Sequence, residues 1–347
     1  MSTENKKEVS ALITRGLIWS LSIGVIFLIA LIIFVSTHLE ETRELLEIVK
    51  SAKPAWLALA VLAQIVTYVF TGAIWYLVAR SAKYYLSLRN LTHLAIEQTG
   101  VNQLIPIGGV AGNIIIVKAM TRLGLPSALA IEVLFVEMLS YYISFSFVTF
   151  VSLLILAFYH NITPIILSLV GAFFLIELFI TIIIWAAVNH KKLTLPGWIK
   201  KRKLMIQIFG AMEDISSDRV FSTKLLIETS LLRLGVFLLD AGTLFMIMKA
   251  IGAQGTLTTA FVAFVIASLA GAITFMPGGL GGFEAGSIAT LALLGMPLGS
   301  AIIATIFLRI LILWIPLVPG LMMAREDLGN SIGWTVQDSN LPPPHCK

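Results

Sequence analysis

Charged residues are scarce in this chain. Only 12% of its 347 residues are Asp, Glu, Lys or Arg, whereas 58% are hydrophobic and the mean hydropathy is +0.95. This balance excludes an ordinary soluble domain and is typical of a polytopic membrane protein. The net charge of +5 does not indicate a nucleic-acid partner, because basic residues in membrane proteins gather in cytoplasmic loops.

Cysteine is nearly absent, and so are the motifs of common catalytic sites. Cys346 is the single cysteine, so neither an intramolecular disulfide nor a thiolate metal cluster is possible. The sequence has no HExxH motif, no nucleophile elbow and no nucleotide-binding motif, and its five histidines are scattered. We therefore expect no metal, no cofactor and no direct use of ATP. The sequence does not indicate the oligomeric state.

Long apolar runs, by contrast, are abundant. About 20 consecutive apolar residues suffice for a helix that crosses a bilayer. The first run has no small-residue cleavage site after it, so we interpret it as a membrane span rather than a signal peptide. We expect an all-α fold with about six full transmembrane helices, at residues 17–37, 55–79, 127–157, 164–188, 225–250 and 299–322.

Two further apolar regions, 92–121 and 257–295, contain Pro and Gly where a continuous helix should avoid them. The later region includes TFMPGGLGGFEAG, from Thr274 to Gly286. Proline removes a backbone donor and glycine disfavours helix, so we expect the helices to be broken here. Broken backbone survives at membrane depth only beside protein or a water-filled cavity. We therefore predict a re-entrant helix hairpin in each region.

The two broken regions are related by an offset of 171 residues. At this offset Pro106 falls on Pro277, Gly108 falls on Gly279, and an LGLP motif falls on an LGMP motif. In the expected topology the first hairpin enters from the cytoplasmic face and the second from the opposite face. Inverted-topology repeats with paired broken helices are typical of alternating-access transporters, whose binding site lies near the midplane. The alternative, in which the glycines only allow close helix packing, stays open.

This topology divides the chain into four parts. Residues 1–16 form a cytoplasmic segment, 17–160 the first membrane repeat, 161–322 the second, and 323–347 a disordered cytoplasmic tail. Most Lys and Arg residues then lie on the side that holds both termini, as expected for the cytoplasmic face of a multi-pass protein of the cell membrane.

The 189–224 loop is strongly basic. Its 190–203 stretch mixes Lys and Arg with apolar residues, which favours contact with anionic lipid at the membrane surface. The simpler alternative is a cytoplasmic loop whose basic residues have no separate role.

Three elements together resemble a known family. They are the PGGLGxxE element, an earlier N-x-x-x-P-x-G-G element that begins at Asn102, and Arg309 in the last span. The set resembles the lysylphosphatidylglycerol synthase transmembrane-region family of flippase-like integral membrane proteins, over about residues 15–325. In the family's best-known members this membrane unit precedes a soluble domain that transfers an aminoacyl group from tRNA to a lipid. The unit itself is associated with moving the modified lipid between leaflets. Because this chain ends soon after its last span, we expect the membrane unit alone, without aminoacyl-transferase activity.

The polar groups of the broken regions suit a lipid phosphate. A helix start offers free N–H groups and partial positive charge, and glycine lets the backbone approach a ligand closely. Glu284 either caps its own helix or contacts a cationic head group or carries a proton. Arg309 either binds phosphate or pairs with Glu284 or another acid. The candidate substrate-binding residues are Asn102, Pro106, Gly108, Gly109, Gly112, Asn113, Pro277, Gly278, Gly279, Gly281, Gly282, Glu284 and Arg309.

Charged residues also fall inside the expected spans, where function and structural pairing both remain open. Arg233 and Asp240 share a helix face and either pair with each other or with groups on other helices. We expect Glu177 to be a protonated carboxyl hydrogen-bonded to a neighbour. Glu132 and Glu137 point in different directions, and Glu132 lies nearer the interface.

The favoured function is a flippase or lipid transporter. It would move a charged or glycosylated phospholipid, or an isoprenoid-linked lipid, through a polar cavity at the midplane, because an unpaired charge is costly to bury in hydrocarbon. Membrane lipid is then the partner. The alternatives are a membrane-embedded enzyme that modifies lipid, and an accessory subunit that partners the enzymes of a lipid or glycan synthesis pathway.

Overall fold

The structure is a computed structural model, and it describes residues 47–104, 110–159, 164–189, 214–274, 277–317 and 319–320. Within these ranges the chain is helical and contains no strand. Outside them lie the first expected span, most of the basic loop, both terminal segments, and the candidate residues Pro106, Gly108 and Gly109.

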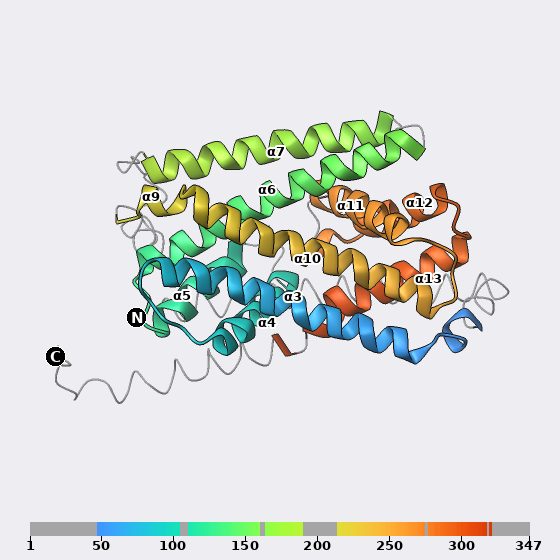
Figure 1. Cartoon of the computed structure of the whole chain (residues 1–347), viewed down its shortest axis with the longest axis horizontal. Helices are drawn as coiled ribbons and strands as arrows, with labels where there is room; N and C mark the ends of the chain where they lie inside the picture. The colour runs from blue at the N-terminus through green and yellow to red at the C-terminus, as the bar shows by residue number, and fades with distance from the viewer. Residues whose placement is uncertain are drawn as a thin grey trace.

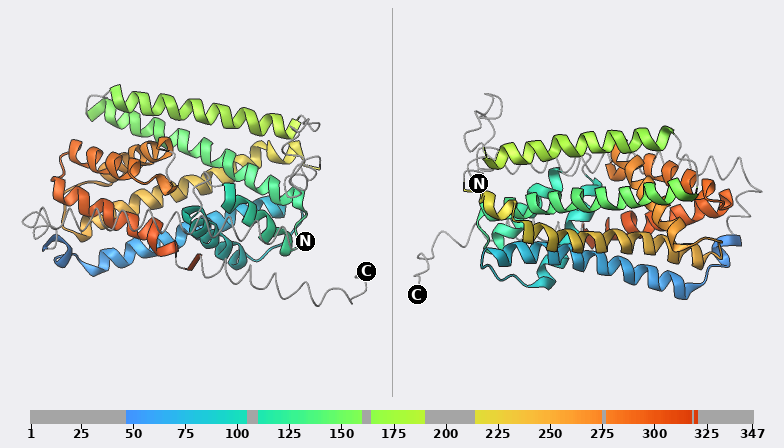
Figure 2. Two further views of the ribbon diagram at one scale, coloured as in Figure 1. Left: turned by 180° about the vertical axis from the view of Figure 1, so that it is seen from behind. Right: turned by 45° about the horizontal axis from the view of Figure 1, so that its top comes forward.

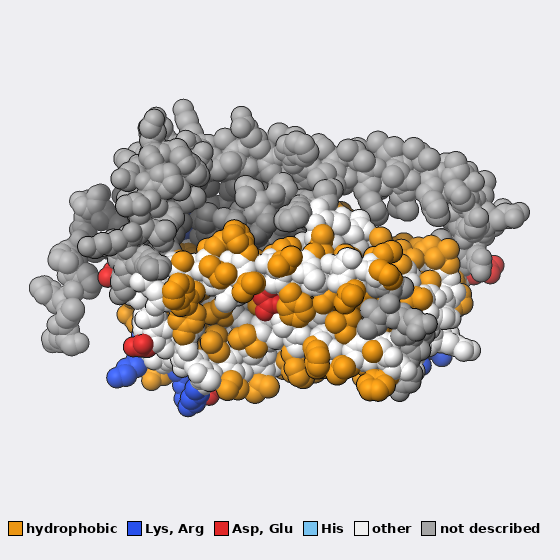
Figure 3. All heavy atoms as spheres, turned by 90° about the horizontal axis from the view of Figure 1, so that it is seen from above, with side chains coloured by type: hydrophobic (Ala, Val, Ile, Leu, Met, Phe, Trp, Pro, Cys, Tyr) orange, Lys and Arg blue, Asp and Glu red, His pale blue; other side chains and the backbone are white. Residues whose placement is uncertain are grey.

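Among the described residues, five helical segments are long and apolar enough to cross a membrane. The four longest of the described helices run beside one another along the long axis of the molecule (Figure 1). In the part of the face that Figure 3 draws in colour, hydrophobic side chains are spread along the molecule and most charged side chains lie near its two ends. The all-α polytopic membrane fold is confirmed by these segments: α3 (Pro54–Ser81), α6 (Ser127–Tyr159), α7 (Pro164–Asn189), α10 (Thr223–Ala250) and the last span, Leu298–Leu317.

The last span is not a uniform α-helix. Its first part, α13 (Leu298–Arg309), passes directly into a π-helical turn, η2 (Ile310–Trp314). Such turns are rare and occur often at functional sites. The turn begins immediately after Arg309, so it changes the helix register on one side of that residue.

Each glycine-rich region consists of two helices. The first contains α4 (Leu88–Leu104) and α5 (Val110–Arg122). The second contains α11 (Leu257–Ile273), the short 3-10 turn η1 (Pro277–Gly279) and α12 (Gly282–Leu293). Positive φ angles of 60°, 65° and 85° occur in the second break, at Gly278, Gly279 and Gly281. Residues with a Cβ rarely adopt these angles, which explains why the PGGLGG stretch breaks the helix.

Helices α11 and α12 form an antiparallel hairpin with close backbone packing. A Cβ atom added to Gly279 would lie 3.0 Å from the Cα of Gly271, and one added to Gly286 would lie 3.1 Å from the Cα of Ala267. The contacts on α11 move backward as α12 advances, which defines the hairpin. This hairpin and the α4–α5 pair lie toward opposite ends of the bundle (Figures 1 and 2). Turn η1 nevertheless contacts α4, so the two broken regions meet.

The local structure recurs at the offset of 171 residues. Helices α5 and α12 end at corresponding positions, and the helices after them, α6 and α13, begin at corresponding positions. Gly124 and Gly295, in the connecting turns, have φ angles of 96° and 89°. The order of a long helix, a broken pair and another helix therefore occurs twice along the chain. The turn hydrogen bonds correspond as well: Gly124 N to Thr121 O and Leu125 N to Met120 O match Gly295 N to Ala292 O and Met296 N to Leu291 O.

Two buried apolar clusters stabilise the two ends of the bundle. One joins α3, α4, α5 and the first half of α6, and has Trp75 fully buried within it. The other joins the second halves of α6 and α10 to α7, α11 and α13. In it the ring of Phe145 meets that of Phe173 edge to face and lies tilted against that of Phe237.

Candidate functional site

Arg309 and Glu284 form an ion pair at the break between α11 and α12. The Nε atom of Arg309 donates to Oε1 of Glu284 at 2.5 Å, and its Nη2 donates to the carbonyl oxygen of Gly278 at 2.7 Å. The guanidinium also lies 4.6 Å from the centre of the Phe283 ring. Arg309 is only 6% exposed, so these contacts hold a charge that has almost no water around it. The last span thereby fixes the glycine turn in place.

Glu284 also caps its own helix. Its Oε2 atom accepts a hydrogen bond of 2.7 Å from the backbone N–H of Gly281, three residues earlier. A carboxylate at a helix start is favoured by the helix dipole and satisfies a free backbone donor. Its side chain is 26% exposed, against 8% for Arg309, so the carboxylate is the accessible member of the pair. Glu284 therefore both caps α12 and pairs with Arg309, the two structural roles that the sequence analysis offered as alternatives.

The first broken region presents amides rather than charges. Nε2 of Gln98 on α4 donates to Oδ1 of Asn113 on α5 at 3.1 Å. Asn102 is partly buried near the end of α4, and its Oδ1 atom is buried without a hydrogen-bond partner among the described residues. Gly112 lies in the first turn of α5. Asn113 and Glu284 correspond at the repeat offset. Asn113 joins α5 to α4, and Glu284 joins α12 to the turn that precedes it.

A second buried ion pair links three of the long helices. Nη2 of Arg233 on α10 donates to Oε1 of Glu137 on α6 at 2.9 Å. The indole N–H of Trp75 on α3 donates to the other oxygen of Glu137 at 2.6 Å. Asp240 instead accepts a hydrogen bond of 2.9 Å from Gln64 on α3. Of the two sequence alternatives, Arg233 and Asp240 therefore bond to other helices and not to each other.

The remaining two intramembrane acids also have local partners. Oε2 of Glu177 on α7 accepts a hydrogen bond of 2.6 Å from Ser146 on α6, in agreement with the expected neighbour. Glu132, near the start of α6, accepts from the backbone N–H of Ser216 at 2.7 Å and pairs with Arg219 of α9 (Ser217–Val220). Glu132 therefore ties the segment before α10 to the start of α6.

Residues 18–320 match the family model described as the lysylphosphatidylglycerol synthase TM region. The chain belongs to this family. A search of curated proteins finds no match. The match contains both broken regions, all five described spans and every candidate site residue, so the resemblance noted from the motifs is confirmed.

Several partners in this family member were not predicted from its sequence. Gln64, Trp75 and Ser146 bind the intramembrane acids, and the carbonyl of Gly278 binds Arg309. A Trp or Ser inside a span carries no mark that separates such a role from ordinary packing. Which side chain bonds to which acid depends on how the helices cross. The residue pattern of one helix carries no information on that crossing.

The cavity found between described helices lies away from the hairpin residues. It lies between α6 and α10 and has a volume of about 440 Å³, and no hairpin residue is among the side chains that line it. Among the described residues, no three His, Cys, Asp or Glu side chains form a group that could hold a metal ion. The described residues predicted to bind substrate lie instead at the hairpins, where Glu284 is the more exposed member of its ion pair.

Proposed function

We propose that this member of the lysylphosphatidylglycerol synthase TM region family moves a lipid with a charged head group between leaflets. The substrate class is a charged or glycosylated phospholipid or an isoprenoid-linked lipid. The observation that carries the proposal is the Glu284–Arg309 pair at a broken hairpin. Ionisable groups inside membrane proteins are costly and tend to mark substrate pathways.

The chemistry of the pair suits a head group that carries a phosphate. Guanidinium binds phosphate with two parallel hydrogen bonds, and the start of α12 adds partial positive charge. An arriving phosphate competes with the Glu284 carboxylate for Arg309. Because the Glu284 side chain is 26% exposed, it can turn away without becoming a buried unpaired charge. The released carboxylate is then available to an amine on the same head group.

The two halves of the chain provide the movement in this proposal. The recurring helix bounds, the hairpins toward opposite ends, and the contact between η1 and α4 support an inverted-topology repeat. In such transporters the repeats move against each other around a site near the midplane. Asn102 and Asn113 of the first hairpin would supply neutral donors and acceptors opposite the charges of the second.

The orientation belongs to the same proposal. Both termini lie in the cytoplasm, residues 17–160 and 161–322 form the two repeats, and the protein lies in the cell membrane. The basic stretch 190–203 contacts anionic lipid there. The high content of Lys and Arg in this stretch supports the assignment.

A double variant separates a functional pair from a structural one. Glu284→Gln combined with Arg309→Met removes both charges while keeping similar side-chain volume, so no unpaired charge is left in the hairpin. The matched control, Glu132→Gln with Arg219→Met, removes an ion pair outside the hairpins. The assay is movement of fluorescent anionic, aminoacylated and isoprenoid-linked lipids across liposomes that contain the purified chain.

We expect the control to move lipid at the wild-type rate and the hairpin variant to lose movement while remaining folded. A folded hairpin variant with wild-type rates would remove Glu284 and Arg309 from the mechanism. An inactive wild-type chain would instead favour the accessory role.

A further inference from the structure

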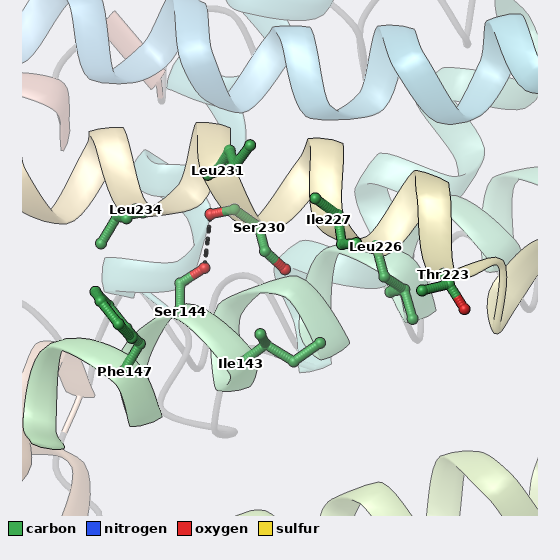
Figure 4. A pocket seen from close by; sticks show the side chains of 9 residues that line it. All are labelled: Ile143, Ser144, Phe147, Thr223, Leu226, Ile227, Ser230, Leu231 and Leu234. Carbon is green, nitrogen blue, oxygen red and sulfur yellow. Dashed lines mark hydrogen bonds between the residues drawn. The ribbon is translucent and has the colours of Figure 1, made fainter.

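An apolar groove opens between α6 and α10 on the membrane-spanning part of the molecule. Its volume of about 440 Å³ falls within the roughly 300–1,000 Å³ typical of small-molecule sites. Figure 4 shows side chains of α6 facing those of α10 across it. The lining residues are Ile143, Ser144 and Phe147 of α6, and Thr223, Leu226, Ile227, Ser230, Leu231 and Leu234 of α10.

Hydroxyl groups join the two helices at the groove without making it polar. The hydroxyl of Ser144 donates to the backbone oxygen of Ser230 at 2.8 Å, as the dashed line in Figure 4 marks. Those of Ser140 and Thr229 lie 2.6 Å apart nearby. Because Ser144 is bonded to the opposite helix, the surface left for a ligand is mainly aliphatic and aromatic.

The rim of the groove consists of large hydrophobic side chains. Ile143, Phe147, Ile227 and Leu231 are each between 47% and 63% exposed. All four lie within helices that are long and apolar enough to cross a membrane. An apolar groove exposed on membrane-spanning helices has the chemistry that suits an acyl chain.

The length of the groove matches one leaflet. From Thr223 to Leu234 the α10 backbone rises about 16 Å, at about 1.5 Å per residue. The hydrocarbon core of a bilayer is about 30 Å thick, so this length covers about half of it. Thr223 is the first residue of α10, and Ile143 is near the middle of α6. The groove thus runs from the end of the span to the membrane centre.

A basic side chain stands at the outer end of the groove. Lys224 is next to Thr223 and one helical turn from Ile227, and its side chain is 86% exposed. Its Nζ atom forms an ion pair with Oε1 of Glu228 at 3.9 Å, and exposed pairs of this kind contribute little, so a phosphate can displace the carboxylate. The ammonium group is therefore accessible to a phosphate at the membrane surface.

We propose that this groove holds one acyl chain of an anionic phospholipid, with the lipid phosphate at Lys224. The site is separate from the Glu284–Arg309 pair, and occupancy of the groove does not require that the bound lipid be transported. An apolar groove that covers one leaflet and ends at an exposed ammonium is the observation that selects this occupant over a free fatty chain or a peptide.

The test uses the full-length chain in nanodiscs of phosphatidylcholine with a small fraction of phosphatidylglycerol. The phosphatidylglycerol carries a diazirine near the end of one acyl chain, and cross-linked peptides are mapped by mass spectrometry. We expect labelling at Ile143, Phe147, Ile227 and Leu231 to exceed labelling at Leu175 and Phe179, which are exposed on α7. Excess unlabelled phosphatidylglycerol should remove the difference.

Two variants, each with a matched control, sharpen the test. Ile227→Trp fills the groove from its exposed rim, and we expect groove labelling to fall about tenfold, equivalent to about 1.4 kcal/mol of binding free energy. Leu238→Trp, on the same helix outside the groove, should leave it unchanged. Lys224→Gln should weaken competition by phosphatidylglycerol, whereas Lys249→Gln at the other end of α10 should not.

Three outcomes would overturn the proposal. Groove labelling equal to that of α7 would mean ordinary lipid contact, and labelling that resists competition would mean that no site exists. Cross-links between the grooves of two copies, with lipid excluded, would identify another chain as the occupant. None of these results depends on whether the protein moves lipid.

Discussion

Neutralising Glu284 alone should destabilise the protein more than removing Arg309 alone. In Glu284→Gln the new side chain still accepts a hydrogen bond from Gly281, but Arg309 keeps its charge at 6% exposure. A buried charge that loses its partner typically costs about 3–5 kcal/mol of unfolding free energy. The amide remaining near Arg309 and the Gly278 carbonyl offset part of this, so we expect a loss near the lower end, about 3 kcal/mol.

Arg309→Met leaves a carboxylate that is 26% exposed and still caps α12. We expect this variant to lose about 1.5–3 kcal/mol, the usual contribution of hydrogen bonds to charged groups. The double variant should lose less than the sum of the two, by about 0.5–3 kcal/mol, because residues in direct contact are coupled.

The measurement is a denaturant titration in mild detergent, followed by intrinsic tryptophan fluorescence, on the wild type and the three variants. The Glu132–Arg219 pair provides a parallel cycle outside the hairpins. Strictly additive losses at Glu284 and Arg309 would show that the two side chains do not interact, and would refute the reasoning.

Two further predictions concern backbone and hydrogen bonding. Gly279→Ala should lower the free energy of unfolding by about 1–2 kcal/mol from its φ of +65° alone. Gly242→Ala on α10, with open space around it, should raise it by up to about 1 kcal/mol. Equal melting temperatures of the two variants would contradict this. Trp75→Phe removes the indole donor from Glu137 and should cost about 1–3 kcal/mol. The same change at Trp314, which is 40% exposed, should stay within about 0.5 kcal/mol. A similar loss at both positions would refute the role of the indole.

Hydropathy and helix breakers were enough to predict most of the fold. The span expected at 55–79 is Pro54–Ser81 in the structure, and the one expected at 225–250 is Thr223–Ala250. The Pro and Gly residues of PGGLGG predicted the break because few other residues tolerate its backbone angles. The π-helical turn after Arg309 was missed, since nothing in ILILW distinguishes it from ordinary helix.

The partners of the charges depended on information that the sequence lacks. The helical period placed Arg233 and Asp240 on one face, but their neighbours are set by how α3 and α6 cross α10. The groove between α6 and α10 was not predicted either, because it too depends on how these helices pack. The stripe from Thr223 to Leu234 resembles an ordinary helix face in sequence, and it becomes one wall of a cavity only through its packing beside α6.

We propose that the two broken hairpins enter from opposite leaflets, and two single-cysteine variants measure this directly. Ser127 and Leu298 are exposed first residues of corresponding helices, at the outer ends of the two hairpin regions. In a Cys346→Ser background, each is changed to Cys separately and intact cells are treated with a membrane-impermeant maleimide. The account predicts labelling of Leu298→Cys from outside, and of Ser127→Cys only after the membrane is permeabilised. Labelling of both positions from the same face would contradict it.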